Sequence, residues 1–160
     1  MPLVFVYGTL MRAGANHAVL ARLGSTFRCA ARTRERRTLV DLGPYPALLP
    51  VRRAARPPAT CIEGEVWEID DDALRELDAF EGCPELYTRE RIGLVSADGE
   101  ELEVFVYTLA IRPPRHARVI ASGRYAAAGT TLPEGASPEQ LLSAPLASSP
   151  PPTRTRRRRR

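Results

Sequence analysis

The chain has 160 residues, of which 44% are hydrophobic and 26% charged, and both values are typical of one globular domain. No apolar run approaches the roughly 20 residues that a membrane helix needs, and no signal-peptide pattern opens the chain, so we expect a cytoplasmic protein. The net charge is +4, but the six arginines at 154 and 156–160 leave −2 for the rest, which argues against nucleic-acid binding by the folded part.

The first residues predict a buried strand followed by a glycine turn. Residues 3–7 form a continuous run of β-branched and aromatic side chains, the pattern of a buried strand. Gly8 can adopt a positive φ, and without a Cβ it lets a ligand approach the backbone closely. Residues 11–15 are expected to form a loop, and Asn16 is expected to cap a short helix that ends at Gly24.

The next segment predicts strands separated by loops. Two strands are expected within residues 25–40, around a basic patch at 32–37 that we interpret as a solvated turn or edge. Three prolines within residues 43–50 predict a rigid loop, because proline fixes φ and lacks an amide donor. Residues 52–58 are expected to form an exposed connector, and the alternation of residues 61–69 predicts another strand.

A helix and a hairpin are predicted in the second half of the chain. Three aspartates at 70–72 can accept hydrogen bonds from the first amides of a helix, and an apolar stripe at helical spacing continues to Phe80. Pro84 ends this helical run. Residues 90–96 and 101–109 alternate on either side of an Asp-Gly turn, which is the pattern of a β-hairpin.

The composition changes near residue 133. We therefore predict one folded domain over residues 1–132 and a tail over residues 133–160. The tail is rich in proline, serine and alanine, ends in arginines, and is expected to be largely disordered, with at most one helical turn at 139–142. Its arginine run could bind phosphates, nucleic acid or an acidic membrane surface, but a terminus without such a role is the interpretation that we favour.

Glu81 is the main candidate for chemistry. It follows an aromatic residue at the predicted end of a helix, where desolvation would raise the pKa of its carboxyl group. A raised pKa is what a general acid or base working near neutral pH requires. From the residues alone, a solvated glutamate at a helix end is the commoner alternative. Asp78 lies on the same helical face and could orient the site, whereas Glu85 is expected to be exposed.

Two segments of the sequence together resemble a known family. They are Tyr7–Leu10, with the sequence Tyr-Gly-Thr-Leu, and Asp78–Pro84, with the pattern Asp-x-Phe-Glu-x-x-Pro, which continues to Tyr87 and Arg89. Over roughly residues 2–126 the chain resembles the gamma-glutamylcyclotransferase-like superfamily, and within it the gamma-glutamylamine cyclotransferase branch, with the plant avirulence-induced-gene-like proteins as relatives. The resemblance implies an α+β fold, built as a small, mainly antiparallel β-barrel with flanking helices.

The same resemblance implies an enzyme and its reaction. A gamma-glutamyl amine would cyclise, with release of 5-oxoproline and a free amine, and neither a cofactor nor a metal would be needed. The family's catalytic glutamate lies in the same context as Glu81, which would act as the general acid/base. The implied substrate-binding residues are Tyr7, Gly8, Thr9, Leu10, Tyr45 and Tyr87.

Other chemistries have weaker support in the sequence. The two histidines lack the spacing of metal ligands, and the three cysteines form no Cys-x-x-Cys pair. Thr9 has no base near it in sequence, and a dyad of Cys83 with a histidine is a minor alternative. Two other functions stay open, a non-catalytic binder of glutamyl-like ligands and a biosynthetic enzyme that removes a gamma-glutamyl protecting group.

Overall fold

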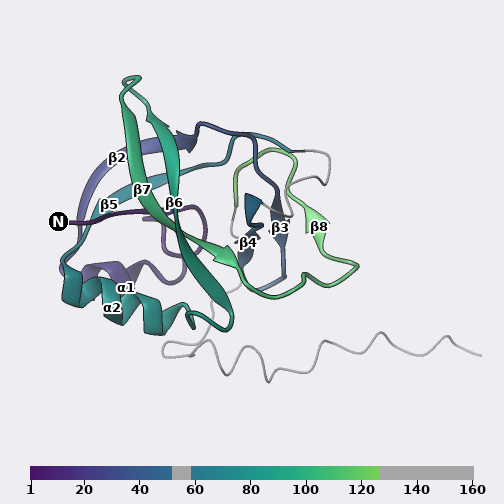
Figure 1. The fold of residues 1–160 in the computed structure, drawn as a ribbon, viewed down its shortest axis with the longest axis horizontal. Coiled ribbons are helices and arrows are strands. Elements are labelled where there is room, and N and C mark those ends of the chain that lie inside the picture. The colour runs from purple at the N-terminus through teal and green to yellow at the C-terminus, as the bar shows by residue number, and fades with distance from the viewer. Residues whose placement is uncertain (52–58, 127–160) are drawn as a thin grey trace, which may run out of the picture.

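The computed structural model describes residues 1–51 and 59–126, and its main feature is a closed five-stranded barrel (Figure 1). The strands follow one another around the barrel in the order β1 (Leu3–Val6), β5 (Glu63–Glu68), β2 (Thr26–Thr33), β6 (Tyr87–Ser96) and β7 (Glu101–Leu109). Strands β1 and β7 close it as a parallel pair, and the other neighbours are antiparallel. The predicted α+β fold with a mainly antiparallel barrel is therefore confirmed.

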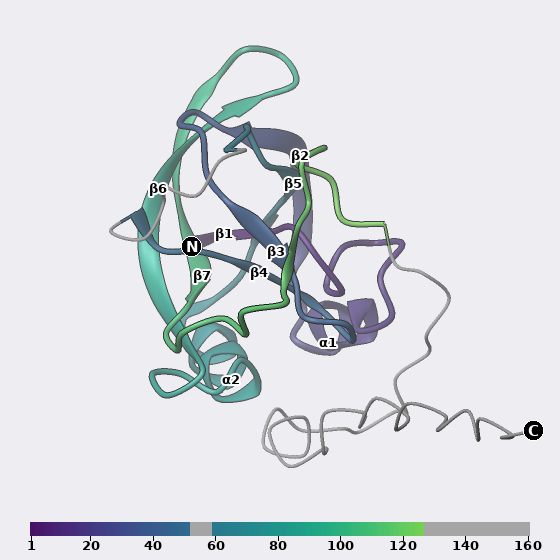
Figure 2. The ribbon, with the colours of Figure 1, turned by 90° about the vertical axis from the view of Figure 1, so that its right-hand side faces the viewer.

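Two helices lie at the same end of the barrel, α1 (His17–Arg22) and α2 (Asp71–Phe80) (Figures 1 and 2). Helix α2 begins as the aspartates predict, because the side chain of Asp70 accepts a 2.7 Å hydrogen bond from the amide of Ala73. Its apolar stripe is buried at Ala73, Leu74 and Leu77. The helix therefore presents one apolar face to the barrel and ends where Glu81 follows.

A second, smaller sheet contains β4 (Pro46–Leu48), β3 (Leu39–Asp41) and β8 (Arg118–Val119), in that order. The rigid loop predicted over residues 43–50 is therefore wrong in part. Pro46 is the first residue of β4, a position where the missing amide donor interrupts little of the ladder. Because β4 also contacts β7, this sheet brings Tyr45 and Pro46 to the barrel.

Strand β1 divides its side chains between two parts of the core. Because side chains alternate along a strand, Val4 and Val6 belong to one apolar cluster, whereas Phe5 and Tyr7 belong to another. The first cluster also contains the buried side chains of the two helices. Both faces of the strand are covered, which explains why its sequence is a continuous apolar run. The buried strand predicted for residues 3–7 is therefore confirmed.

The predicted hairpin is confirmed as the pair β6–β7, although β6 starts at Tyr87 rather than at residue 90. Gly99 in its turn has a φ of 87°, which suits the Asp-Gly sequence. The predicted strand at 61–69 is confirmed as β5.

The basic patch at 32–37 is only partly the solvated turn that was predicted. The side chain of Arg37 is 3% exposed, and its Nη2 donates hydrogen bonds to Glu90 at 2.7 Å and to the carbonyl oxygen of Leu49 at 3.1 Å. The four residues that do face solvent are Arg32, Arg34, Glu35 and Arg36.

Several predictions lie outside the described residues. They are the connector at 52–58, the domain boundary at 132, the helical turn at 139–142 and the tail at 133–160. Among the helices of residues 1–51 and 59–126, none has the length and apolar character needed to cross a membrane.

Candidate active site

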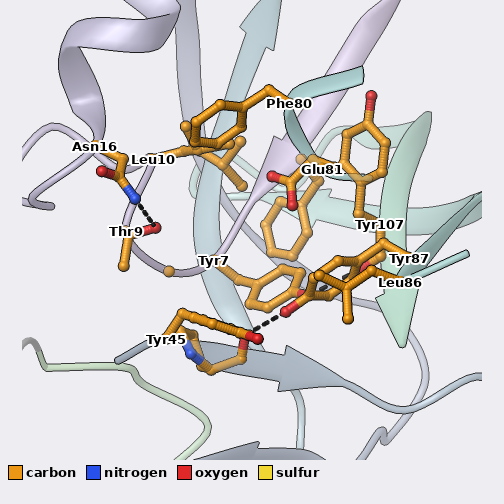
Figure 3. Close-up of a pocket in the computed structure, with 14 residues that line it drawn as sticks. Tyr7, Thr9, Leu10, Asn16, Tyr45, Phe80, Glu81, Leu86, Tyr87 and Tyr107 are labelled. Carbon is orange, nitrogen blue, oxygen red and sulfur yellow. Dashed lines mark hydrogen bonds between the residues drawn. The ribbon is translucent and has the colours of Figure 1, made fainter. Parts of the chain in front are cut away.

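A pocket opens beside Glu81, where the loop after β1, strand β4, the end of α2 and strands β6 and β7 meet (Figure 3). Its cavity volume is about 70 Å³. The fourteen lining residues are Phe5, Val6, Tyr7, Gly8, Thr9, Leu10, Asn16, Tyr45, Pro46, Phe80, Glu81, Leu86, Tyr87 and Tyr107. All seven residues that the sequence analysis assigned to the site are among them, so residues far apart in the chain are brought together here.

The end of helix α2 fixes the backbone at Glu81. Glu81 is the C-cap residue, and Gly82 follows with a φ of 67°. The amide of Gly82 donates to the carbonyl oxygen of Ala79 at 3.2 Å, and that of Cys83 to the carbonyl oxygen of Asp78 at 2.9 Å. These two bonds form the glycine-dependent Schellman motif that commonly ends helices. Local sequence therefore places Glu81 at a defined turn.

The carboxyl group of Glu81 points into the pocket, with Phe80 on one side and Tyr107 on the other (Figure 3). Burial raises its pKa to about 8. Its side chain has no hydrogen-bond partner in the part of the chain that the structure describes, and no other lining residue is an Asp, Glu, Arg or His. An isolated carboxyl group that titrates near neutral pH can both accept and return a proton.

Tyr7 joins the site to the barrel. Its hydroxyl donates a 2.8 Å hydrogen bond to the carbonyl oxygen of Tyr107 and accepts a 3.1 Å bond from the amide of Leu48. One side chain directly after β1 therefore links β7 and β4 at the pocket. Its phenol is held by these contacts, and burial raises its pKa above the ordinary value.

Gly8 is required for packing rather than for a positive φ. A Cβ at this position would lie 2.6 Å from Cγ of Pro46, closer than real side chains approach. The glycines with positive φ in the described residues are Gly24, Gly43, Gly82, Gly99 and Gly123. Gly8 therefore does not use the left-handed conformation that glycine permits, and the close neighbour found here is Pro46 of this chain. The close approach of a ligand to Gly8 stays a prediction.

Two tyrosines, Tyr45 and Tyr87, also form part of the pocket wall. The ring centroids of Tyr45 and Tyr87 are 6.3 Å apart, and the hydroxyl of Tyr87 donates to the carbonyl oxygen of Pro46 at 3.2 Å. Burial, followed by the nearby charge of Glu81, raises the pKa of Tyr45. Tyr87 is both a buried core residue and part of the pocket wall.

Asp78 and Arg89 lie behind the pocket. Arg89 donates a hydrogen bond to Oδ2 of Asp78 at 2.6 Å. The other oxygen, Oδ1, accepts a 2.8 Å hydrogen bond from the hydroxyl of Tyr107. Neither Asp78 nor Arg89 lines the cavity, and Glu85 is exposed as expected.

Seven lining residues have no counterpart in the sequence analysis as site residues, namely Phe5, Val6, Asn16, Pro46, Phe80, Leu86 and Tyr107. Five of them lie within two residues of a predicted site residue in the sequence, so this proximity was a usable signal. Tyr107 reaches the site only because β7 pairs with β6, and Asn16 only because the loop after β1 folds back. Nothing local in the sequence marks either one.

Catalysis by the thiol of Cys83 finds little support in this structure. Burial raises the pKa of the Cys83 thiol to about 11, so it is protonated near neutral pH. The ring of His17 bonds instead with the carbonyl oxygen of Leu10 and packs 5.2 Å from Trp67. Within residues 1–51 and 59–126, no group of three or more His, Cys, Asp or Glu side chains could hold a metal ion.

Comparisons with known proteins agree with this fold. Residues 4–127 match the model of the family described as gamma-glutamyl cyclotransferase, AIG2-like. A gamma-glutamylaminecyclotransferase of Homo sapiens is 41% identical over 135 residues, which cover 74% of this chain and 86% of the relative. One of Bos taurus is 44% identical over 119 residues, with 69% and 67% covered. The crystal structure of an AIG2-like protein from Mus musculus superposes with a TM-score of 0.70 at 32% identity, and covers 81% of this chain and 90% of that one.

A family match over most of the described chain, with relatives above 40% identity, identifies the family. The chain belongs to the gamma-glutamyl cyclotransferase, AIG2-like family, and it is an enzyme of the gamma-glutamylcyclotransferase type.

Proposed function

We propose that this enzyme is a gamma-glutamylamine cyclotransferase, in which Glu81 is the general acid/base and the segment Tyr7–Leu10 holds the glutamyl group. The observation that carries the proposal is the position of Glu81, an isolated carboxyl group with a pKa of about 8 that faces this segment across one pocket. Relatives at 35–44% identity that are named gamma-glutamylaminecyclotransferase support the choice of an amine as the leaving group.

The reaction is an internal displacement. The α-nitrogen of the substrate attacks its own γ-carbonyl carbon, a new C–N bond closes the five-membered ring, and the bond to the amine nitrogen breaks. Two protons leave the α-ammonium nitrogen as it becomes the N–H of the lactam, and the departing nitrogen takes up both and leaves as an ammonium group. Glu81 accepts these protons in turn and returns them, so the enzyme ends in the state in which it began, and the products are 5-oxoproline and the amine.

Burial of Glu81 makes this proton transfer feasible. An α-ammonium group titrates near about 8 and an ordinary glutamate near about 4.3, so an exposed carboxylate would accept the proton with great difficulty. With a pKa of about 8, Glu81 is matched to the α-ammonium group. Holding the amine and the carbonyl in contact adds to this, because well-oriented intramolecular reactions reach effective molarities of roughly 10⁵–10⁸ M.

The shape of the pocket fits a small group better than a peptide. The cavity is small, and six of its fourteen lining residues are aromatic, so it suits the glutamyl moiety, with the amine directed toward solvent. The loop Tyr7–Leu10 offers backbone amides that could stabilise the oxyanion that forms during attack. Tyr45 and Tyr87 would border the bound glutamyl group.

The test is release of 5-oxoproline by the wild-type protein and by Glu81→Gln, with gamma-glutamyl-ε-lysine, gamma-glutamyl-alanine and glutathione as substrates. We expect release from the lysine isopeptide, and its loss in Glu81→Gln while substrate binding is largely kept. Activity retained in the variant would overturn the role of Glu81. Binding without turnover by the wild-type protein would favour a non-catalytic binder instead.

We also propose a cytoplasmic enzyme with one domain over residues 1–132 and no cofactor. The three cysteines are free thiols, which suits a reducing compartment. A biosynthetic enzyme that removes a gamma-glutamyl protecting group would use the same chemistry, so a wider panel of gamma-glutamyl amines is needed to separate the two. A nucleic-acid role of the arginine run would be seen as salt-dependent binding that truncation at Pro150 removes.

A further inference from the structure

The side chain of Asn16 does not form the hydrogen bond that is usual at the start of a helix. Asn16 is the N-cap residue of α1, where an asparagine normally accepts a hydrogen bond from an amide of the first helical turn. Here the side chain forms no capping bond. Its Nδ2 instead donates to Oγ1 of Thr9 at 3.2 Å, and its backbone amide donates to the carbonyl oxygen of Thr9 at 2.9 Å. Both hydrogen bonds that Asn16 donates are therefore directed at one pocket residue.

The loop between these two residues is folded tightly enough to fix this contact. A Cβ on Gly14 would lie 2.1 Å from the carbonyl oxygen of Thr9, so only glycine fits there. The amide of Met11 also donates to the carbonyl oxygen of Gly8 at 3.1 Å. Thr9 and Asn16 both line the cavity, on the side away from Glu81 (Figure 3).

Most hydroxyl groups around the pocket are already engaged. The protons of Tyr7, Tyr87 and Tyr107 are donated to protein acceptors, respectively the carbonyl oxygens of Tyr107 and Pro46 and the carboxylate of Asp78. Among the lining residues that the structure describes, this leaves the hydroxyls of Thr9 and Tyr45 as side-chain O–H donors for a ligand.

The contact with Asn16 decides where the Thr9 proton points. A threonine hydroxyl has one proton and two acceptor lone pairs. Because Asn16 presents an N–H group to Oγ1, the Thr9 proton has no acceptor on that side and is free to turn toward the cavity. We propose that Asn16 is a positioning residue, which orients the Thr9 hydroxyl so that it donates a hydrogen bond to an oxygen of the gamma-glutamyl group. This inference rests on the proposed function.

The decisive variant is Asn16→Asp, because it keeps the shape of the side chain and reverses its hydrogen bonding. A carboxylate at this position accepts the Thr9 proton and turns it away from the cavity. We expect kcat/KM for 5-oxoproline release to fall about tenfold to hundredfold, as when a donor to a reacting oxygen is lost. Thr9→Val should give a similar loss, whereas Thr9→Ser, which keeps the hydroxyl, should stay within about threefold of wild type.

A double-mutant cycle separates this role from a merely structural one. If Asn16 acts through the Thr9 proton, adding Asn16→Asp to the Thr9→Val variant should lower kcat/KM little further. The two losses in kcat/KM then do not multiply. Ala15→Asp is the matched charge control, since Ala15 is exposed and does not line the cavity. It should leave kcat/KM close to wild type, and the thermal midpoints of all folded variants should agree within a few degrees.

The outcomes of this experiment are distinguishable. Losses that multiply in the double variant, or an Asn16→Asp enzyme as active as wild type, overturn the inference while the proposed function stands. A folded wild-type enzyme that releases no 5-oxoproline from any substrate overturns the proposed function, and the inference with it. Non-multiplying losses with an inactive Glu81→Gln variant support both.

Discussion

The hydroxyl of Tyr107 on β7 donates a 2.8 Å hydrogen bond to Oδ1 of Asp78 on α2. The same carboxylate holds Arg89 of β6 through its second oxygen, and the backbone carbonyl of Asp78 accepts the amide of Cys83 in the turn that contains Glu81. One residue therefore fastens the end of α2 to both strands of the hairpin.

We expect Asp78→Ala to lower both stability and turnover. Loss of two hydrogen bonds, one of them charged, should lower the free energy of unfolding by about 1–3 kcal/mol. The turn at Glu81 loses its attachment to the barrel, so kcat should fall more than KM changes. Urea unfolding and steady-state kinetics measure the two effects. The Asp78→Asn variant can still accept a hydrogen bond from Tyr107, so its free energy of unfolding should lie between those of Asp78→Ala and wild type. Equal stability of all three proteins would contradict this role of Asp78.

The pH dependence of kcat/KM should report the raised pKa of Glu81. In the free enzyme the carboxyl group is protonated below its pKa of about 8 and cannot accept the proton of the α-ammonium group. The rate constant should therefore fall about tenfold per pH unit below about pH 7. The pH at which kcat/KM falls to half on the acid side should be the same for two substrates with different leaving amines, because this pH reflects a group of the free enzyme. A midpoint near 4.5 would show that Glu81 titrates as an ordinary glutamate.

Glu81→Gln should also change how stability depends on pH. The folded pKa of about 8 exceeds the ordinary value of 4.5, so the wild-type protein is most stabilised below 4.5 and loses that stability as pH rises to about 8. Glutamine does not titrate. Relative to wild type, the variant should therefore gain about 1–4 kcal/mol in the free energy of unfolding between pH 5 and pH 8. Urea titrations at the two pH values measure this difference, and a constant difference would mean that Glu81 is not buried in solution.

The close approach at Gly8 predicts a variant and its rescue. In Gly8→Ala the new Cβ would meet the ring of Pro46, so the loop or β4 must shift, and we expect a destabilised protein with at least a tenfold loss of kcat/KM. Pro46→Ala removes the ring atoms that clash. The double variant should therefore be more stable than Gly8→Ala alone, whereas purely additive losses would place the cause elsewhere.

The features that could be predicted from the sequence are those that depend on local chemistry. The aspartates before α2, its apolar stripe and the glycine after Glu81 specify a helix and its end within about a dozen residues, and the Asp-Gly turn specifies the hairpin in the same way. Glu81 could be assigned a role because its family motif lies within this stretch. The resemblance to a family then supplied the loop Tyr7–Leu10, which no local rule marks as a binding site.

The remaining features depend on partners that are distant in sequence. Arg37 is buried because Glu90, 53 residues later, accepts its hydrogen bond. The charge-rich sequence around Arg37 does not indicate this burial. Strand β4 forms in a proline-rich segment because β3 pairs with it. The side chain of Asn16 could be placed at a helix start from sequence, but its actual partner, Thr9, depends on how the intervening loop folds.

Closure of the barrel by β1 and β7 has a consequence for protein synthesis. Val4 pairs with Phe105, and the hydroxyl of Tyr7 reaches a carbonyl oxygen 100 residues further along. The segment Tyr7–Leu10 therefore cannot take its final form until nearly the whole domain has left the ribosome, several seconds after β1 at about 5–20 residues per second. During that interval the edge of β1 that later pairs with β7 has no partner, and strands of other nascent chains can pair with it. We therefore expect this protein to be most prone to aggregation on crowded polysomes.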